Sequence, residues 1–141
     1  MTFGITAVTN YTITYDDNLS TGGAVPADTV GNGSVTLRSN TGTLEKTGYT
    51  FNGWTDGTTL FHAGDAYSVG SQNITLTAQW TVETYVITYS HNTGASGSAS
   101  RTSDSLIYGA QPITLPTVGT MVKSGYSFAG WSLTTNGAVL T

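Results

Sequence analysis

Apolar and polar residues alternate along several short stretches of the chain, with the period of two that is typical of β-strands. Residues 11–15 show this pattern, and residues 85–89 repeat it. Shorter strands are predicted around residues 35–37 and 113–115, whereas no stretch has the pattern of an amphipathic helix. The longest alternation, in residues 74–80, places one set of side chains on a single face: Ile74, Leu76, Ala78 and Trp80.

An internal repeat sets the organisation of the chain. The strand at residues 11–15 returns at 85–89, and 46-KTGYTFNGW-54 returns as 123-KSGYSFAGW-131. A unit of ~70 residues buries only about 60 % of its unfolded surface, so each copy should be modestly stable. We expect the following division: an N-terminal strand in residues 1–10, a first repeat in 11–82 and a truncated second repeat in 83–141, with a short linker near 81–84.

Each copy of the repeated block is expected to supply aromatic side chains to a small core. A strict period of two would place Trp54 on the opposite face from Phe51. Gly53 lies between them, and a glycine inside a strand often marks a β-bulge, which would turn Trp54 back toward the core. The same reasoning applies to Gly130. The predicted core aromatics are Phe51, Trp54, Trp80, Phe128 and Trp131.

Three motifs together resemble the Listeria–Bacteroides repeat, the B-repeat of internalin-type and other bacterial surface proteins. These are Tyr-x-Ile-x-Tyr, Lys-x-Gly-Tyr-x-Phe-x-Gly-Trp and Ile-Thr-Leu-x-Ala-Gln-Trp. Residues 11–80 carry the whole pattern, whereas residues 85–141 carry it only as far as Trp131 and a short tail. The resemblance implies small, mixed, β-grasp-like sheets with little helix, a secreted or cell-surface location and no catalytic residue.

The first repeat ends with the strand at residues 74–80. The second repeat has no counterpart of this last strand. A sheet that lacks a strand exposes backbone hydrogen-bonding groups and an apolar slot. The N-terminus offers a matching strand, although Thr9 falls where Trp80 would be. The candidate assembly residues are Phe3, Ile5 and Ala7, which alternate as Ile74, Leu76 and Ala78 do.

Three explanations of this surplus and missing strand stay open. The chain is a piece of a longer array with ragged ends, or residues 2–9 of one copy complete the second repeat of another. The latter is strand addition, and a head-to-tail contact of this kind propagates into a filament unless it closes into a ring. In the third explanation residues 2–9 fold back onto the second repeat of their own chain.

The composition argues against several classes of partner. Charged residues make up 9 % of the chain, with four Lys and Arg against eight Asp and Glu and a net charge of −4. Nucleic acid binding requires a basic surface, and this balance argues equally against an anionic membrane partner. No apolar run is long enough to span a membrane, so we expect no membrane insertion.

No arrangement of residues predicts catalysis or a cofactor. His62 and His91 occupy non-equivalent places in the two repeats and lack the spacing of a metal site. No nucleophile elbow is present, and no pair of carboxylates recurs in both repeats. The weak candidates for calcium ligands are Asp16, Asp17, Asp56 and Asp65, for which turn formation is the simpler interpretation.

The sequence therefore predicts a non-enzymatic structural or adhesive module of a bacterial surface protein. Its expected partners are other copies of itself or neighbouring repeats, and strand completion would extend such copies into a fibre. The alternative is a module that binds a glycan or a host receptor. A binding module should expose clustered aromatic side chains along one edge, whereas a structural module should bury them.

Overall fold

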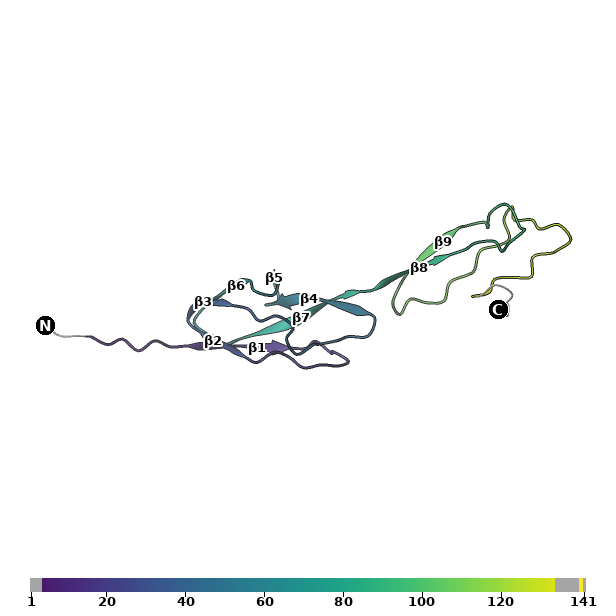
Figure 1. Ribbon diagram of the computed structural model, residues 1–141. Helices are drawn as coiled ribbons and strands as arrows, with labels where there is room; N and C mark the ends of the chain where they lie inside the picture. The colour runs from purple at the N-terminus through teal and green to yellow at the C-terminus, as the bar shows by residue number, and fades with distance from the viewer. Residues whose placement is uncertain (1–3, 134–139, 141) are drawn as a thin grey trace. The chain divides into compact units, whose positions relative to one another are not determined.

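The computed structural model describes residues 4–133 and 140. Across these residues the chain forms nine strands and no helix, which confirms the prediction of a mainly β protein. The strands belong to one five-stranded sheet and two two-stranded sheets. The chain divides into two compact units, the first ending at Glu83 and the second beginning at Thr84 (Figure 1).

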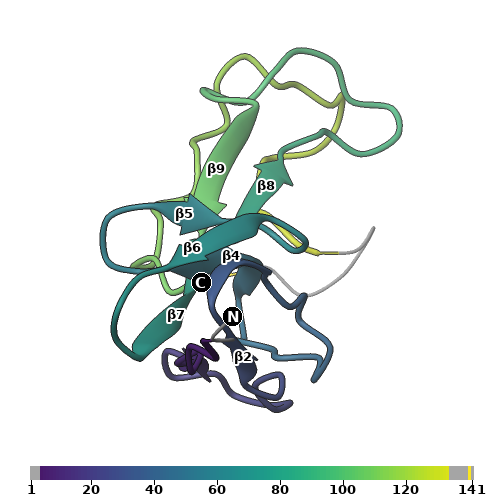
Figure 2. The ribbon, with the colours of Figure 1, turned by 90° about the vertical axis from the view of Figure 1, so that its left-hand side faces the viewer.

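The first unit is built on a mixed sheet with the strand order β2-β1-β7-β4-β5. A separate antiparallel pair, β3 and β6, adds Val35, Tyr67 and Val69 to the same core. Both views place β6 beside β5, where the rings of Phe61 and Tyr67 meet edge to face (Figures 1 and 2). The strands are β1 (Tyr11–Asp16), β2 (Thr29–Gly31), β3 (Gly33–Thr36), β4 (Tyr49–Thr55), β5 (Leu60–Phe61), β6 (Ala66–Val69) and β7 (Ile74–Val82).

Strand β7 is the central strand of the first unit, although it comes last in the sequence of that unit. It pairs in parallel with β1, with Tyr15 opposite Leu76, and antiparallel with β4, with Trp54 opposite Ala78. Leu76 and Ala78 are fully buried. Strand β7 pairs with the backbone N–H and C=O groups on the facing edges of β1 and β4. A unit without this strand would therefore be divided into two halves.

Trp54 lies at the centre of the core of the first unit. Its side chain is 0 % exposed, and its indole Nε1 donates a hydrogen bond of 3.0 Å to the carbonyl oxygen of Arg38. Gly53 has φ of 135°, and the pairing of β4 with β7 shifts its register between Phe51 and Gly53. This is the bulge that the sequence predicts, and it brings Phe51 and Trp54 into one cluster. The other buried apolar residues are Ile13, Tyr15, Leu37, Leu44, Val69, Leu76 and Ala78.

The described strands of the second unit are β8 (Thr84–Thr88) and β9 (Ser103–Ile107), which form one antiparallel pair. The strand predicted around Ile113 and Leu115 is wrong, because residues 111–118 carry no strand. In the first unit β3 is held by β6, and the described part of the second unit offers no strand in the place of β6. An extended segment that has no neighbouring strand to pair with forms no ladder of backbone hydrogen bonds.

The segments predicted at the unit boundaries also differ from expectation. Residues 4–10 carry no strand, and Ile5 is 90 % exposed, while Phe3 lies outside the described residues. The predicted linker at residues 81–84 is taken up by strands, because β7 ends at Val82 and β8 begins at Thr84. The N-terminal segment therefore has no strand partner within the described part of its own chain.

Replacing Gly53 by alanine tests whether the bulge is required. A Cβ atom at this position would collide with the carbonyl oxygen of Phe61, and the positive φ is unfavourable for alanine. We expect Gly53→Ala to lower the free energy of unfolding by roughly 2–3 kcal/mol, measured by urea unfolding with tryptophan fluorescence. Gly70→Ala is the matched control, since a Cβ there meets nothing within 4 Å. Equal midpoints for the two variants would show that the bulge is dispensable.

Candidate functional site

The acidic residues predicted as weak calcium ligands form turns in the structure. Asp16 accepts a hydrogen bond from the backbone N–H of Asn18, and Asp17 accepts one from that of Leu19. Asp56 accepts the backbone N–H groups of Thr59 and Thr58, which lower the pKa of its carboxyl group.

Asp65 closes the remaining turn, where it accepts the backbone N–H of His62. Among residues 4–133 and 140, no group of three or more His, Cys, Asp or Glu side chains is arranged to hold a metal ion. His62 and His91 both lie in exposed loops. The polar residues singled out in the sequence are therefore not gathered into one site.

An aromatic cluster recurs in both units with nearly the same geometry. In the first unit the Trp54 ring lies 4.8 Å from Tyr15 and 5.1 Å from Phe51, with interplanar angles of 58° and 69°. In the second unit the corresponding distances from Trp131 are 5.0 Å to Tyr89 and 5.4 Å to Phe128, with angles of 56° and 71°. The cluster of the second unit is thus formed without a counterpart of β7 among the described residues.

The turn and bulge that support this cluster also recur. A bridge joins Lys123 to Tyr126 as one joins Lys46 to Tyr49, and Gly130 has φ of 141°. The indole Nε1 of Trp131 donates to the carbonyl oxygen of Pro116 at 2.8 Å. The repeated sequence block therefore encodes a side-chain arrangement that persists even where residues 127–131 form no strand.

The two clusters differ in what covers them. Ile87 is 36 % exposed, whereas its counterpart Ile13 is 0 % exposed. Phe128 is 44 % exposed, so the prediction that it is a core residue is wrong, and Trp131 is half-buried. In the first unit Trp80 covers the equivalent Phe51, with ring centroids 5.5 Å apart. The described second unit has no such side chain.

The ring contacts of the second unit match those that lie on the two sides of the central strand in the first unit. Neighbouring strands lie about 4.8 Å apart, so β1 and β4 are separated by about 10 Å across β7. Tyr89 and Trp131 meet at nearly the same distance as Tyr15 and Trp54, so the ring contact that is made across this separation in the first unit recurs in the second. We call this place, between β8 and residues 126–131, the acceptor position of the second unit.

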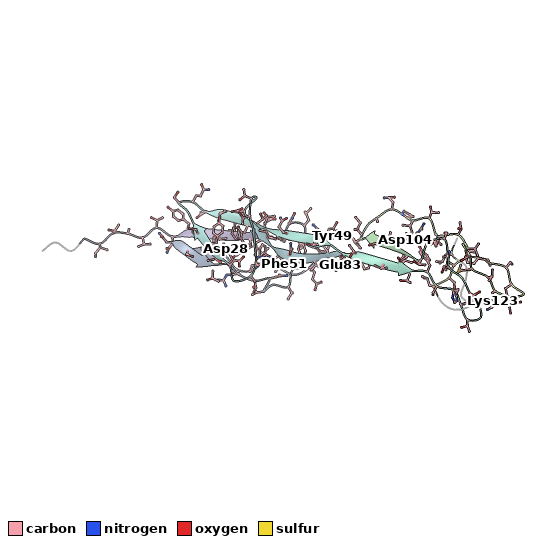
Figure 3. All side chains as sticks on the ribbon, turned by 90° about the horizontal axis from the view of Figure 1, so that it is seen from above. Asp28, Tyr49, Phe51, Glu83, Asp104 and Lys123 are labelled. Atoms are coloured by element: carbon pink, nitrogen blue, oxygen red, sulfur yellow. The ribbon has the colours of Figure 1, made fainter. Side chains whose placement is uncertain are left out.

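A second candidate site is a shallow, open hollow of about 320 Å³ in the first unit. Lys46 lies at this hollow, with its amino group 5.3 Å from the ring of Tyr49 and 5.9 Å from that of Trp80. The same amino group donates to the carbonyl oxygen of Asn18 at 2.9 Å. Figure 3 labels three residues that line the hollow: Tyr49, Phe51 and Glu83.

A polar network in the second unit was not foreseen from the sequence. The hydroxyl of Tyr89 donates to Asp104 at 2.8 Å, and Nε of Arg101 lies 2.7 Å from the same carboxylate (Figure 3 labels Asp104). In the first unit the hydroxyl of Tyr15 instead shares a hydrogen bond with Thr29. Because the two units differ here, the repeat itself carries no signal for this network.

The pKa of Asp104 lies below its ordinary value of 3.8. Burial alone would raise it, but the hydrogen bonds from Tyr89 and Arg101 and the positive charge of Arg101 outweigh that effect. The ionised carboxylate is therefore the form that the folded second unit prefers.

Comparisons with known proteins identify the repeats. Residues 11–79 and 85–139 match the family model of the Listeria-Bacteroides repeat domain. A protein of Evansella cellulosilytica, named as a Gly-rich membrane protein, is 32 % identical over 139 residues. A second protein of this organism, named as a membrane protein, is 34 % identical over 95 residues.

These two alignments cover 91 % and 67 % of the chain, but only 16 % and 14 % of the two relatives. The chain thus corresponds to a small part of each of these longer proteins. No solved structure matches it. Among the described residues there is no helix that could cross a membrane.

The network around Asp104 should make the stability of the second unit depend on pH. A carboxyl group with a lowered pKa stabilises the fold above its ordinary pKa, and this contribution is lost as the pH falls through the folded value. We expect Asp104→Asn to destabilise the second unit near neutral pH, and the difference from wild type to shrink below about pH 3.8. Urea unfolding followed by fluorotryptophan NMR resolves Trp131 from the other indoles.

Asp28→Asn is the control for this experiment, because Asp28 is an exposed carboxylate of the first unit. It should leave the Trp131 transition unchanged at every pH. A difference between Asp104→Asn and wild type that stays constant from neutral to acidic pH would contradict the electrostatic origin of the effect.

Proposed function

The chain belongs to the Listeria-Bacteroides repeat family, and from this premise we propose that it is a non-enzymatic structural or adhesive module of a bacterial cell-surface or extracellular protein. The names of both relatives describe membrane proteins, which supports a location at the cell surface. Each relative is several times longer than the chain, as expected for a protein in which such a module is one part among others.

The observation that carries this proposal is the nature of what the two units share. Both contain the same packed aromatic residues, bulge and lysine turn. The acidic turns belong to the first unit and the Asp104 network to the second. Each unit has one histidine, and the two histidines stand at non-equivalent positions. A duplicated catalytic or ligand-binding module would be expected to repeat its polar groups, whereas a structural module needs only to repeat its core.

We further propose that copies of the 141-residue chain associate head to tail by strand completion. The donor is the segment that contains Ile5 and Ala7, and the receiver is the acceptor position of another copy. Ile5 is 90 % exposed, and residues 4–10 lead directly into β1. The junction of β7 with β8 supports this connection, because a single residue, Glu83, separates a central strand from the first strand of the next unit.

A second candidate function is the binding of a glycan or a host receptor at the hollow beside Lys46. Its aromatic lining, with Phe51 and Trp80 both half-buried, favours this alternative, since sugars stack on such rings. The amino group of Lys46 is already engaged by Asn18, which leaves less polar capacity for a ligand. A glycan array probed with the chain distinguishes the two functions.

The strand-completion proposal predicts a strong difference between two neighbouring substitutions. Ile5 and Val8 are both exposed, at 90 % and 72 %, but they fall on opposite faces of a strand. Ile5→Asp would place a charge in the apolar position next to Tyr89 and should abolish self-association. Val8→Asp adds the same charge on the other face and should leave self-association nearly unchanged.

Analytical ultracentrifugation and electron microscopy of the purified chain measure this association. Wild type and Val8→Asp should show assembly that depends on concentration, and Ile5→Asp should remain monomeric. The same assembly in all three proteins would refute the N-terminal segment as donor. Parallel loss in both variants would point to net charge instead of strand register.

A further inference from the structure

We infer that the parallel pair of β1 and β7 is a shear clamp, which lets the first unit resist a pulling force along the chain. This inference rests on the structural function proposed above and adds a mechanical role to it. The chain enters the first unit through β1 and leaves it through β7, and these two strands are neighbours in the sheet. Figure 1 shows them side by side, with the entry and the exit at opposite ends of the pair.

The direction of the pairing determines how a force acts on it. The two strands run parallel, with Ile13 opposite Ile74 and Asp16 opposite Thr77. Tension in the chain pulls β1 from its first residue and β7 from its last, so the strands are drawn past each other along their length. The backbone hydrogen bonds between them are then stretched together, whereas a pair that is opened from one end loses its bonds one after another. Sliding therefore requires several hydrogen bonds to break in a single step.

Hydrogen bonds of side chains continue the ladder of β1 and β7 past both of its ends. One of them precedes the first residue pair, and others follow the last. They run from Thr12 N–H to Asn73 Oδ1 at 2.9 Å, from Asn18 Nδ2 to the Ala78 carbonyl oxygen at 2.8 Å and from Trp80 Nε1 to the Asp17 carbonyl oxygen at 3.2 Å. Because each bond joins the chain around β1 to the chain around β7, sliding of the strands must break these bonds as well.

The ladder is supported on both faces of the sheet. On the core face Ile13 and Leu76 are 0 % exposed, so water does not reach the backbone from this side. On the outer face the hydroxyl oxygens of Thr14 and Thr75 lie 2.9 Å apart, and Thr14 also donates to the carbonyl oxygen of Ile74. Water would otherwise replace a backbone hydrogen bond as it breaks. The dry core face and the hydroxyl bridge should therefore slow the separation of the strands.

The pair of β1 and β7 is the part of the sheet that yields first under this force. On its other side β7 pairs with β4 over a longer ladder, which extends from Val82 opposite Tyr49 to Thr77 opposite Thr55. Strands β3 and β6 form a separate pair, which lies outside the path of the force from β1 to β7. The resistance to pulling should therefore depend on residues between β1 and β7 and should be insensitive to changes in β3.

Single-molecule force spectroscopy of the full chain tests the clamp through the direction of pulling. The chain has no cysteine, so two engineered cysteines define the points of attachment. Asn10→Cys with Thr81→Cys pulls the strands past each other, and Asn10→Cys with Gln72→Cys opens the same pair from the end at which both strands begin. All three residues are exposed.

We expect the sliding direction to need a force several times larger than the opening direction, because only the first stretches all the bonds together. Equal unfolding forces in the two directions would overturn the inference.

A pair of matched substitutions locates the resistance. Thr14→Val keeps the shape of the side chain but removes its hydroxyl bridge to β7. In the sliding direction, at constant force, its unfolding time should be about fivefold shorter, as expected for the loss of one hydrogen bond. Thr36→Val makes the same chemical change in β3 and should leave the unfolding time unchanged. Equal shortening by both substitutions would place the resistance outside the pair of β1 and β7 and contradict the clamp.

The outcomes for the clamp and for the proposed function are distinguishable. Glycan binding together with a much larger force in the sliding direction would replace the structural function but support the clamp. Equal forces in the two directions without glycan binding would refute the clamp and leave the structural function in place. Urea unfolding of each variant, followed by tryptophan fluorescence, verifies that the first unit is folded before it is pulled.

Discussion

The structure depends on one packing constraint: an indole lies beneath an alanine of the central strand. Trp54 is fully buried opposite Ala78, between Tyr15 and Phe51. The bulge at Gly53 turns the indole to this face, and the carbonyl of Arg38 fixes its ring. The strand between β1 and β4 must then carry a small residue opposite Trp54, because a larger side chain there would overpack the two rings.

The second unit shows which parts of this arrangement form without the central strand. The contacts of Trp131 with Tyr89 and Phe128 persist, so these contacts form without a central strand among the described residues. Burial does not persist, since Ile87 and Phe128 are both partly exposed. Covering one such side chain is worth about 1.5–3 kcal/mol when it becomes fully buried. The second unit thus keeps the ring contacts of the core while the apolar side chains of Ile87 and Phe128 stay partly exposed.

The features that could be predicted from the sequence are those set by local patterns. Alternation identified the strands around Ile13, Ile74 and Tyr85, and glycine between Phe51 and Trp54 identified the bulge. The central place of β7 could not be predicted, because the order of strands along the chain does not determine their order in a sheet. The exposure of Phe128 and the absence of a strand at Ile113 follow from partners that local patterns do not report. Tyr89 belongs to a repeated motif, but its partners Asp104 and Arg101 lie outside the repeated motifs, so the network left no periodic signal.

Placing the last strand of each repeat at the centre of its sheet has a consequence for arrays. The unit is completed only when its final residues are added, and these residues then lead, through Glu83 alone, into the first strand of the next unit. This one-residue connection costs little loop-closure entropy. It links neighbouring repeats through the central strand of the preceding repeat. The side chains that seat this strand in the first unit are those of Leu76, Ala78 and Trp80, so its central place is set by its own sequence as well as by its connection to β8.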